Sequence, residues 1–161
     1  MERVEQRLRD CVTDGPVTAA QLFVARDDEV VLDLAVGNDS RHGGDPVSVD
    51  APFLVASITK PVTATAVLIC VERGLVDLDE PVAAYVPEFT DNGRETVTVR
   101  QILTHTSGLP DMLPDNKALR QRNAAREEFL DQVAETPLDF DPGTRFQYQS
   151  MGFLLARAVV E

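Results

Sequence analysis

The chain reads Phe53-Leu54-Val55-Ala56-Ser57-Ile58-Thr59-Lys60 at the point where a charge-free helix is predicted to begin. This helix is expected to span about residues 57–73, because Pro61 is tolerated only near a helix start and Gly74 is a typical residue at a helix end. A helix that is apolar on every face is normally buried among other elements. We therefore expect this helix to be central to the fold.

Ser57 and Lys60 lie three residues apart, and positions i and i+3 of a helix share one face. Their side chains can therefore converge. A serine alcohol needs such a neighbour, because it is too weak an acid to attack a carbonyl carbon unaided. Burial disfavours the charged form of a lysine, which would leave the amine of Lys60 able to act as a base. The N–H of Ser57 and the positive end of the helix dipole would favour a developing oxyanion.

The pattern Ser-x-x-Lys is common, and a structural interpretation also fits it. In that interpretation Ser57 caps the helix and Lys60 is a solvated residue of the first turn. From these two residues alone the structural interpretation is the better one, so a catalytic interpretation depends on other parts of the chain.

Composition limits the classes of function that the chain can have. Its 161 residues are enough for one domain with a hydrophobic core, so a single domain over residues 1–161 is expected. Apolar residues make up 43% and charged residues 26%, as in ordinary globular proteins. The formal net charge is −12, with acidic residues spread along the chain. Such a surface repels phosphate backbones and anionic lipid, which argues against nucleic-acid and membrane partners.

Targeting signals and cysteine usage point to an intracellular protein. Residues 1–10 are rich in charge and lack the apolar stretch of a signal peptide. The longest charge-free run, residues 61–71, is too short to span a bilayer, so a soluble, cytoplasmic protein is predicted. Cys11 and Cys70 are far apart and match no metal-ligand spacing. We expect two free thiols, no metal and no cofactor.

Hydrophobic spacing predicts the elements that precede Ser57. An amphipathic helix is expected over residues 2–12 and a β-hairpin over residues 19–25 and 30–36. Residues 37–52 are rich in Gly, Asp and Ser and are expected to form a long surface connection, in which His42 would be solvated.

The elements that follow the central helix are mainly helical. Residues 75–96 are predicted to be irregular, and residues 107–110 to form a turn. Helical segments are predicted over three ranges: 98–104 with Thr98 as N-cap, 118–135, and 151–161.

Further segments change the interpretation of Ser57 and Lys60. Downstream of them come Glu72-Arg73-Gly74-Leu75-Val76-Asp77-Leu78-Asp79-Glu80-Pro81-Val82 and Tyr85-Val86-Pro87-Glu88-Phe89, followed by Val97-Thr98-Val99-Arg100-Gln101-Ile102-Leu103-Thr104-His105-Thr106-Ser107-Gly108-Leu109-Pro110. With the stretch around Ser57, these segments resemble the serine β-lactamase family, which includes penicillin-binding proteins, D-amino-acid peptidases and esterases. Several matches in the right order are far more specific than any one of them.

The resemblance implies roles for four residues. Ser57 would be the nucleophile and Lys60 its activating partner. Phe146-Gln147-Tyr148-Gln149-Ser150 is similar to the family's second motif, Tyr-x-Asn. Tyr148 would then be a phenolate or proton relay that deprotonates Ser57 and later protonates the leaving group, although a core tyrosine is the alternative. Ser150 replaces the usual Asn, and its shorter hydroxyl would bind Lys60 or a substrate amide.

His105 suits acid–base chemistry near neutral pH. In the proteins that this chain resembles, however, the His-Thr-Ser-Gly segment is a structural turn. A structural role is therefore expected for His105.

The resemblance also implies a fold class and its limits. It implies an α/β (α+β) architecture of the β-lactamase type, with an antiparallel sheet flanked by helices and a buried nucleophile helix. It covers nearly all of this chain but only part of the family's domain, because the third motif, Lys or His followed by x-Gly, lies in a C-terminal half absent from these residues. That motif supplies the second oxyanion N–H, and losing one such donor costs on the order of a hundredfold in rate.

Two functions from different classes follow. In the first, the chain is a serine hydrolase that is acylated and deacylated at Ser57 by a small-molecule ester or amide, with a complementing C-terminal segment as partner. In the second, it is an inert truncated fragment or a scaffold. For an active enzyme, a cytosolic esterase or peptidase-like hydrolase is favoured over a drug-resistance lactamase, because penicillins act outside the cytoplasm.

Overall fold

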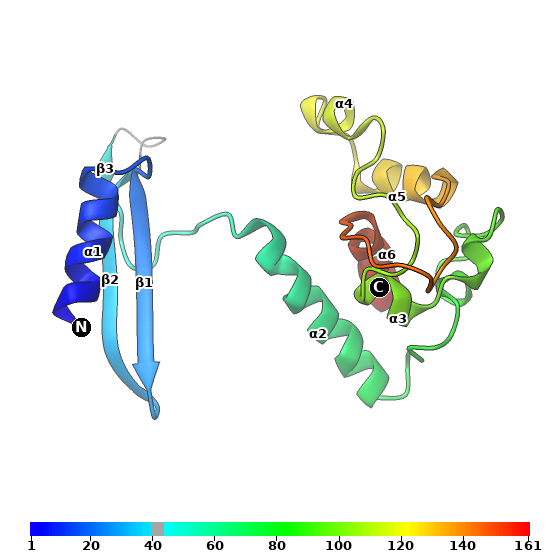
Figure 1. Ribbon diagram of the computed structural model, residues 1–161, viewed down its shortest axis with the longest axis horizontal. Coiled ribbons are helices and arrows are strands. Elements are labelled where there is room, and N and C mark those ends of the chain that lie inside the picture. The colour runs from blue at the N-terminus through cyan, green and yellow to red at the C-terminus, as the bar shows by residue number, and fades with distance from the viewer. Residues whose placement is uncertain (40–43) are drawn as a thin grey trace. The chain divides into compact units, whose positions relative to one another are not determined.

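The computed structural model describes residues 1–39 and 44–161 (Figure 1). Its contacts divide the chain into two compact units, Met1–Leu54 and Val55–Glu161, and each is described by itself. The prediction for His42 lies outside the described residues. That the two units form one domain stays a prediction.

The first unit is a helix beside an antiparallel sheet. Helix α1 (Glu2–Thr13) precedes strands β1 (Ala19–Arg26) and β2 (Glu29–Asp39), which pair with Leu22 opposite Leu34. The predicted helix and hairpin are confirmed. β2 is longer than predicted, because its end at Asn38 and Asp39 pairs with the short strand β3 (Asp45–Pro46). The predicted long irregular connection therefore begins later than the sequence pattern indicated.

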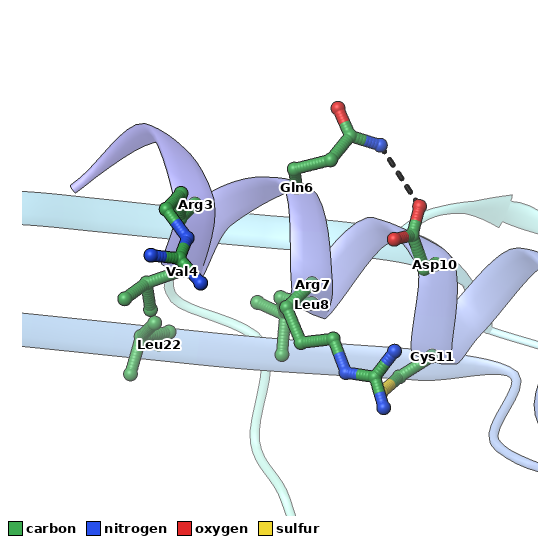
Figure 2. A pocket seen from close by; sticks show the side chains of 8 residues that line it. All are labelled: Arg3, Val4, Gln6, Arg7, Leu8, Asp10, Cys11 and Leu22. Atoms are coloured by element: carbon green, nitrogen blue, oxygen red, sulfur yellow. Dashed lines mark hydrogen bonds between the residues drawn. The ribbon is translucent and has the colours of Figure 1, made fainter.

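Helix α1 packs against the hairpin through its apolar stripe. Figure 2 shows Val4 next to Leu22 of β1, while Gln6 on another face of the helix donates to Asp10 at 2.8 Å. None of the residues of α1 is fully buried. This helix therefore covers one side of the hairpin with partly exposed side chains.

The second unit is built from helices and short 3-10 turns. The turn η1 (Ala56–Ile58) leads directly into helix α2 (Thr59–Glu72), and Gly74, two residues after the end of this helix, has a φ of 69°. After it come η2 (Val82–Ala84), η3 (Arg94–Thr96), α3 (Val99–Leu103), α4 (Asn116–Gln121), α5 (Arg126–Glu135) and α6 (Met151–Val160).

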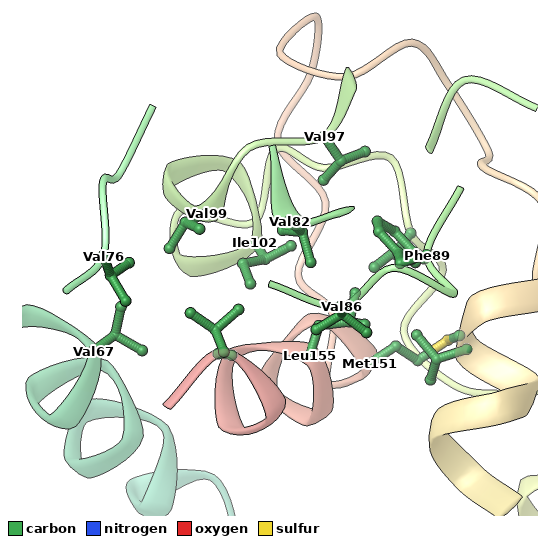
Figure 3. Packing of buried hydrophobic residues seen from close by; sticks show 14 of the residues in the cluster. Val67, Val76, Val82, Val86, Phe89, Val97, Val99, Ile102, Met151 and Leu155 are labelled. Atoms are coloured by element: carbon green, nitrogen blue, oxygen red, sulfur yellow. The ribbon is translucent and has the colours of Figure 1, made fainter. Parts of the chain in front are cut away.

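The hydrophobic core of the second unit lies around α6, which packs against α2, α3 and α5. Figure 3 shows Leu155 of α6 beside Ile102 of α3, and both side chains are fully buried. Val67 of α2 lies next to Val76 in the same cluster. The core therefore joins α2 to the segments that follow it.

The expectation of a buried nucleophile helix needs correction. Val67 is the one residue of α2 that is fully buried, and Val62 and Leu68 are 67% and 49% exposed. The reason is that α2 carries apolar residues on every face, whereas within its unit it packs chiefly against α6 and η1.

No helix in residues 1–39 and 44–161 is long and apolar enough to cross a bilayer.

The predicted helix over residues 118–135 is two helices rather than one. Helix α4 ends at Gln121, and α5 begins at Arg126. Between them Asn123 adopts a left-handed conformation, with a φ of 50°. Asn tolerates that conformation better than most residues, which explains why the chain breaks there.

Thr98 caps α3, as predicted, and does so in a capping box. Its hydroxyl accepts from the N–H of Gln101 at 3.3 Å, and the Gln101 side chain accepts from the N–H of Thr98 at 2.9 Å. Because α3 has only five residues, its shape depends on this cap and on buried Val99 and Ile102.

We expect Thr98→Ala to lower the free energy of unfolding by about 1 kcal/mol, the usual cost of losing an N-cap side chain. Chemical denaturation of the purified chain measures this change. Thr98→Ser keeps the hydroxyl and should stay near wild type. Equal losses in both variants would contradict the capping explanation.

Candidate active site

Lys60 and Tyr148 both lie within hydrogen-bond distance of Ser57. Lys60 Nζ donates to Ser57 Oγ at 3.1 Å, and the Tyr148 hydroxyl donates to the same oxygen at 2.7 Å. Lys60 Nζ also lies 4.8 Å from the centre of the Tyr148 ring. Ser57 and Tyr148 are 91 positions apart in the sequence. The fold therefore brings two distant motifs together around one oxygen atom.

The local backbone aims Ser57 toward this cluster. Ser57 lies in the 3-10 turn η1, and Lys60 is the second residue of α2. Just before Ser57, Ala56 has a φ of 46°, which is costly for a residue other than glycine. Strained backbone of this kind is concentrated at functional sites.

Ser150 connects the cluster to Asp111. Lys60 Nζ donates to Ser150 Oγ at 3.2 Å, and that hydroxyl donates to Asp111 Oδ1 at 3.0 Å. The N–H of Ser150 also donates to the carbonyl of Asp111 at 3.2 Å. Asp111 and Ser150 also line a cavity of about 260 Å³, whose other walls are five apolar side chains and three polar or charged ones: Met112, Leu113, Phe129, Met151 and Leu154, with Asn116, Arg120 and Arg126.

His105 supports the segment that carries Tyr148. Its Nδ1 accepts from the N–H of Gln149 at 3.2 Å, and its carbonyl accepts from the N–H of Gln147 at 2.9 Å. The His105 ring lies 4.7 Å from the Tyr148 ring. Burial first, and then the charge of Lys60, lower the pKa of His105. A neutral imidazole that accepts through Nδ1 agrees with the structural role expected for this residue.

The turn after His105 must pass close to the chain that leads to Tyr148. Gly108 has a φ of 86°, and a Cβ at this position would come within 2.3 Å of the carbonyl oxygen of Phe140. The carbonyl of Gly108 accepts from the N–H of Asp139 at 2.7 Å. Only glycine suits this position, so the turn is fixed against the second motif.

The site is more open to solvent than the sequence suggested. Ser57 is exposed, and Tyr148 is 43% exposed. Lys60 is half-buried between the rings of Tyr148 and Phe153. The burial expected for Lys60 is therefore only partial among the described residues, and its amine points to Ser57 rather than into open solvent.

Hydrogen bonding lowers the pKa of Tyr148, first through Lys60 and then through Ser57. As the pH rises, its phenol should therefore lose a proton before an ordinary tyrosine does. In a pH titration followed by the near-ultraviolet absorbance of phenolate, we expect one early component, that is, a rise in absorbance at a lower pH than an ordinary tyrosine gives. Tyr148→Phe should remove this component, and Lys60→Met should move it to higher pH.

Tyr85 provides the matched control, because the chain has only these two tyrosines. Tyr85→Phe should keep the early component. An early component that persists in Tyr148→Phe would contradict the assignment.

Sequence reasoning missed two residues of the site. Asp111 was not singled out, because its contact with Ser150 joins positions 39 apart. Gln149 is fully buried, and its side chain donates to the carbonyl of Ile102 at 3.0 Å and accepts from the N–H of Gly152. The buried amide of Gln149 therefore holds its neighbours Tyr148 and Ser150 against the core. The only sequence feature that could have indicated this role is the position of Gln149 between these two motif residues.

A serine in the turn that leads into a helix, contacted by a lysine of that helix's first turn and by a distant tyrosine, is the arrangement of the serine β-lactamase and penicillin-binding-protein class. The family model for Beta-lactamase matches residues 4–161, and the chain belongs to this family.

Relatives and solved structures agree with this assignment. Esterase EstB of Burkholderia gladioli is 37% identical over 174 residues, which cover 99% of this chain and 44% of that protein. A penicillin-binding-protein homologue from Caulobacter crescentus has a TM-score of 0.82 at 26% identity, over 99% of this chain and 43% of that chain. The D-amino acid amidase of Ochrobactrum anthropi SV3 has a TM-score of 0.80 at 25% identity, over 97% of this chain and 43% of that chain. The predicted β-lactamase-like fold is confirmed.

The chain spans less than half the length of the curated relatives it matches. The matched part contains the segments with Ser57, Lys60 and Tyr148.

Proposed function

We propose that the chain is part of a serine hydrolase whose two units belong to one β-lactamase-related domain. Its substrate is a small-molecule ester or amide. The observation that carries the proposal is the double contact of Ser57 Oγ, with Lys60 Nζ at 3.1 Å and with the Tyr148 hydroxyl at 2.7 Å. A serine nucleophile needs a neighbouring group that removes its proton, and both neighbours lie within the required distance.

Acylation begins with removal of the Ser57 proton by the Lys60–Tyr148 pair. The lowered pKa of Tyr148 supports a phenolate in this step, held by hydrogen bonds from Lys60 and Ser57. Ser57 Oγ then forms a bond to the substrate carbonyl carbon. The proton passes to the leaving oxygen or nitrogen as the carbon–heteroatom bond breaks, which leaves an acyl group on Ser57.

Deacylation repeats these steps with water. The same pair takes a proton from water, the new oxygen attacks the acyl carbon, and the Ser57 oxygen leaves and regains a proton. The N–H of Ser57 supplies one donor for the oxyanion, and the complementing C-terminal segment supplies the second.

The names of relatives support both an ester and an amide as the type of substrate. EstB is an esterase by name, and the protein from Ochrobactrum anthropi SV3 is a D-amino acid amidase. We propose that the chain shares the acyl-transfer chemistry common to these activities. An ester is the favoured substrate, since EstB is the more similar of the two in sequence.

A covalent probe tests the proposal on the chain as it exists. A fluorophosphonate transfers its phosphonyl group to an activated serine oxygen and releases fluoride. We expect intact mass to increase by one phosphonyl group and peptide mapping to place it on Ser57. An unmodified chain after long incubation would favour the alternative of an inert fragment or scaffold.

A further inference from the structure

This chain has Ser150 where the Tyr-x-Asn motif has Asn, and in the structure the side chain of Ser150 is bound by Asp111. The hydroxyl of Ser150 has a single hydrogen, and that hydrogen points to Asp111 Oδ1 at 3.0 Å. Only its lone pairs then remain for Lys60 Nζ, which donates to the same oxygen at 3.2 Å. The carboxylate therefore fixes which way the hydroxyl faces.

We propose that Asp111 is a positioning residue for the proposed hydrolase, and that through Ser150 it holds Lys60 Nζ against Ser57 Oγ. The inference rests on the proposed function. An Asn at position 150 would reach Lys60 with its own amide oxygen, whereas a serine hydroxyl is shorter and can rotate. Asp111 removes that rotation, so that the Asp111–Ser150 pair does the work of one longer side chain.

Other contacts support this assignment. The N–H of Ser150 donates to the carbonyl of Asp111 at 3.2 Å, so the two residues are joined by a backbone bond that a side-chain substitution leaves in place. The groups around Tyr148 are Lys60 and Ser57, which lower its pKa, and Asp111, which raises it. His105 also contacts the Tyr148 ring. Asp111 is thus close enough to act on the site by charge as well as by position.

The rate at which a fluorophosphonate modifies Ser57 tests the proposal. Asp111→Ala should slow it by about tenfold, the loss expected when a hydrogen bond that holds a reacting group is removed. Asp111→Asn keeps an acceptor for Ser150 and should stay within about threefold of wild type. In Asp111→Asn the phenolate of Tyr148 should also appear at lower pH, because the charge that raises its pKa is gone.

Rescue separates positioning from a general structural role. The double variant Asp111→Ala/Ser150→Asn should recover most of the lost rate, since the new amide reaches Lys60 without help. A residue that only stabilises the fold would give no such recovery. Asp115→Ala, an exposed aspartate of the same connection, is the control and should leave the rate unchanged.

Two results would overturn the inference. One is an Asp111→Ala variant that reacts as fast as wild type, and the other is a slow variant that Ser150→Asn does not restore. If the wild-type chain itself forms no adduct, the proposed function fails. The position of Asp111 beside the site is then tested by the Tyr148 titration alone. If the phenolate of Tyr148 appears at the same pH in Asp111→Asn as in wild type, the inference is overturned in that case as well.

Discussion

Ser57→Ala should abolish modification of the chain by a fluorophosphonate and any hydrolysis of a chromogenic ester. Ser57 Oγ is the oxygen that both Lys60 and Tyr148 contact, at 3.1 and 2.7 Å, and alanine removes it. Loss of the nucleophile in a serine hydrolase lowers the rate on the order of a millionfold, so no adduct should be detected. Intact mass spectrometry after incubation measures this result directly.

The stability of this variant should change little, which makes the result easy to interpret. Ser57 is exposed, and alanine is well tolerated in a helical turn. Ser48→Ala in the first unit serves as the control and should be modified like wild type. An adduct that persists in Ser57→Ala, at any other serine, would falsify the assignment of the nucleophile.

Local sequence patterns predicted most of the helices and strands correctly. The hairpin and helix α6 were found because periodicity and turn residues agree there with the tertiary structure. The break between α4 and α5 was missed, since Asn123 is not a strong breaker in itself. The burial of α2 was predicted wrongly, because an uncharged sequence shows that a helix can be buried but not how much of it is covered.

The candidate site was predicted where motifs are local and missed where contacts are distant. Ser57 and Lys60 are one helical turn apart, so their convergence follows from helix geometry. The proximity of Tyr148 came from the resemblance and not from spacing. Asp111 had no local signal, because its side-chain contact with Ser150 joins positions 39 apart. Such a partner is known only once the chain has folded.

Lys60→Ala should slow modification of Ser57 by on the order of a thousandfold, within the usual range for loss of an acid–base group. Lys60 Nζ joins the two motifs, because it donates to both Ser57 Oγ and Ser150 Oγ. It is also the first cause of the lowered pKa of Tyr148. Its removal should therefore weaken the second partner of Ser57 as well, and the phenolate of Tyr148 should appear only at higher pH.

Lys60→Arg distinguishes the amine from its charge. An arginine stays protonated and presents a planar fork of donors, which does not place one nitrogen between two hydroxyls. We expect its rate to stay within about tenfold of Lys60→Ala. Lys117→Ala removes the only other lysine, on exposed α4, and should react like wild type. If Lys60→Arg instead reacted at the wild-type rate, positive charge alone would suffice, and the lysine would have no part in moving the Ser57 proton.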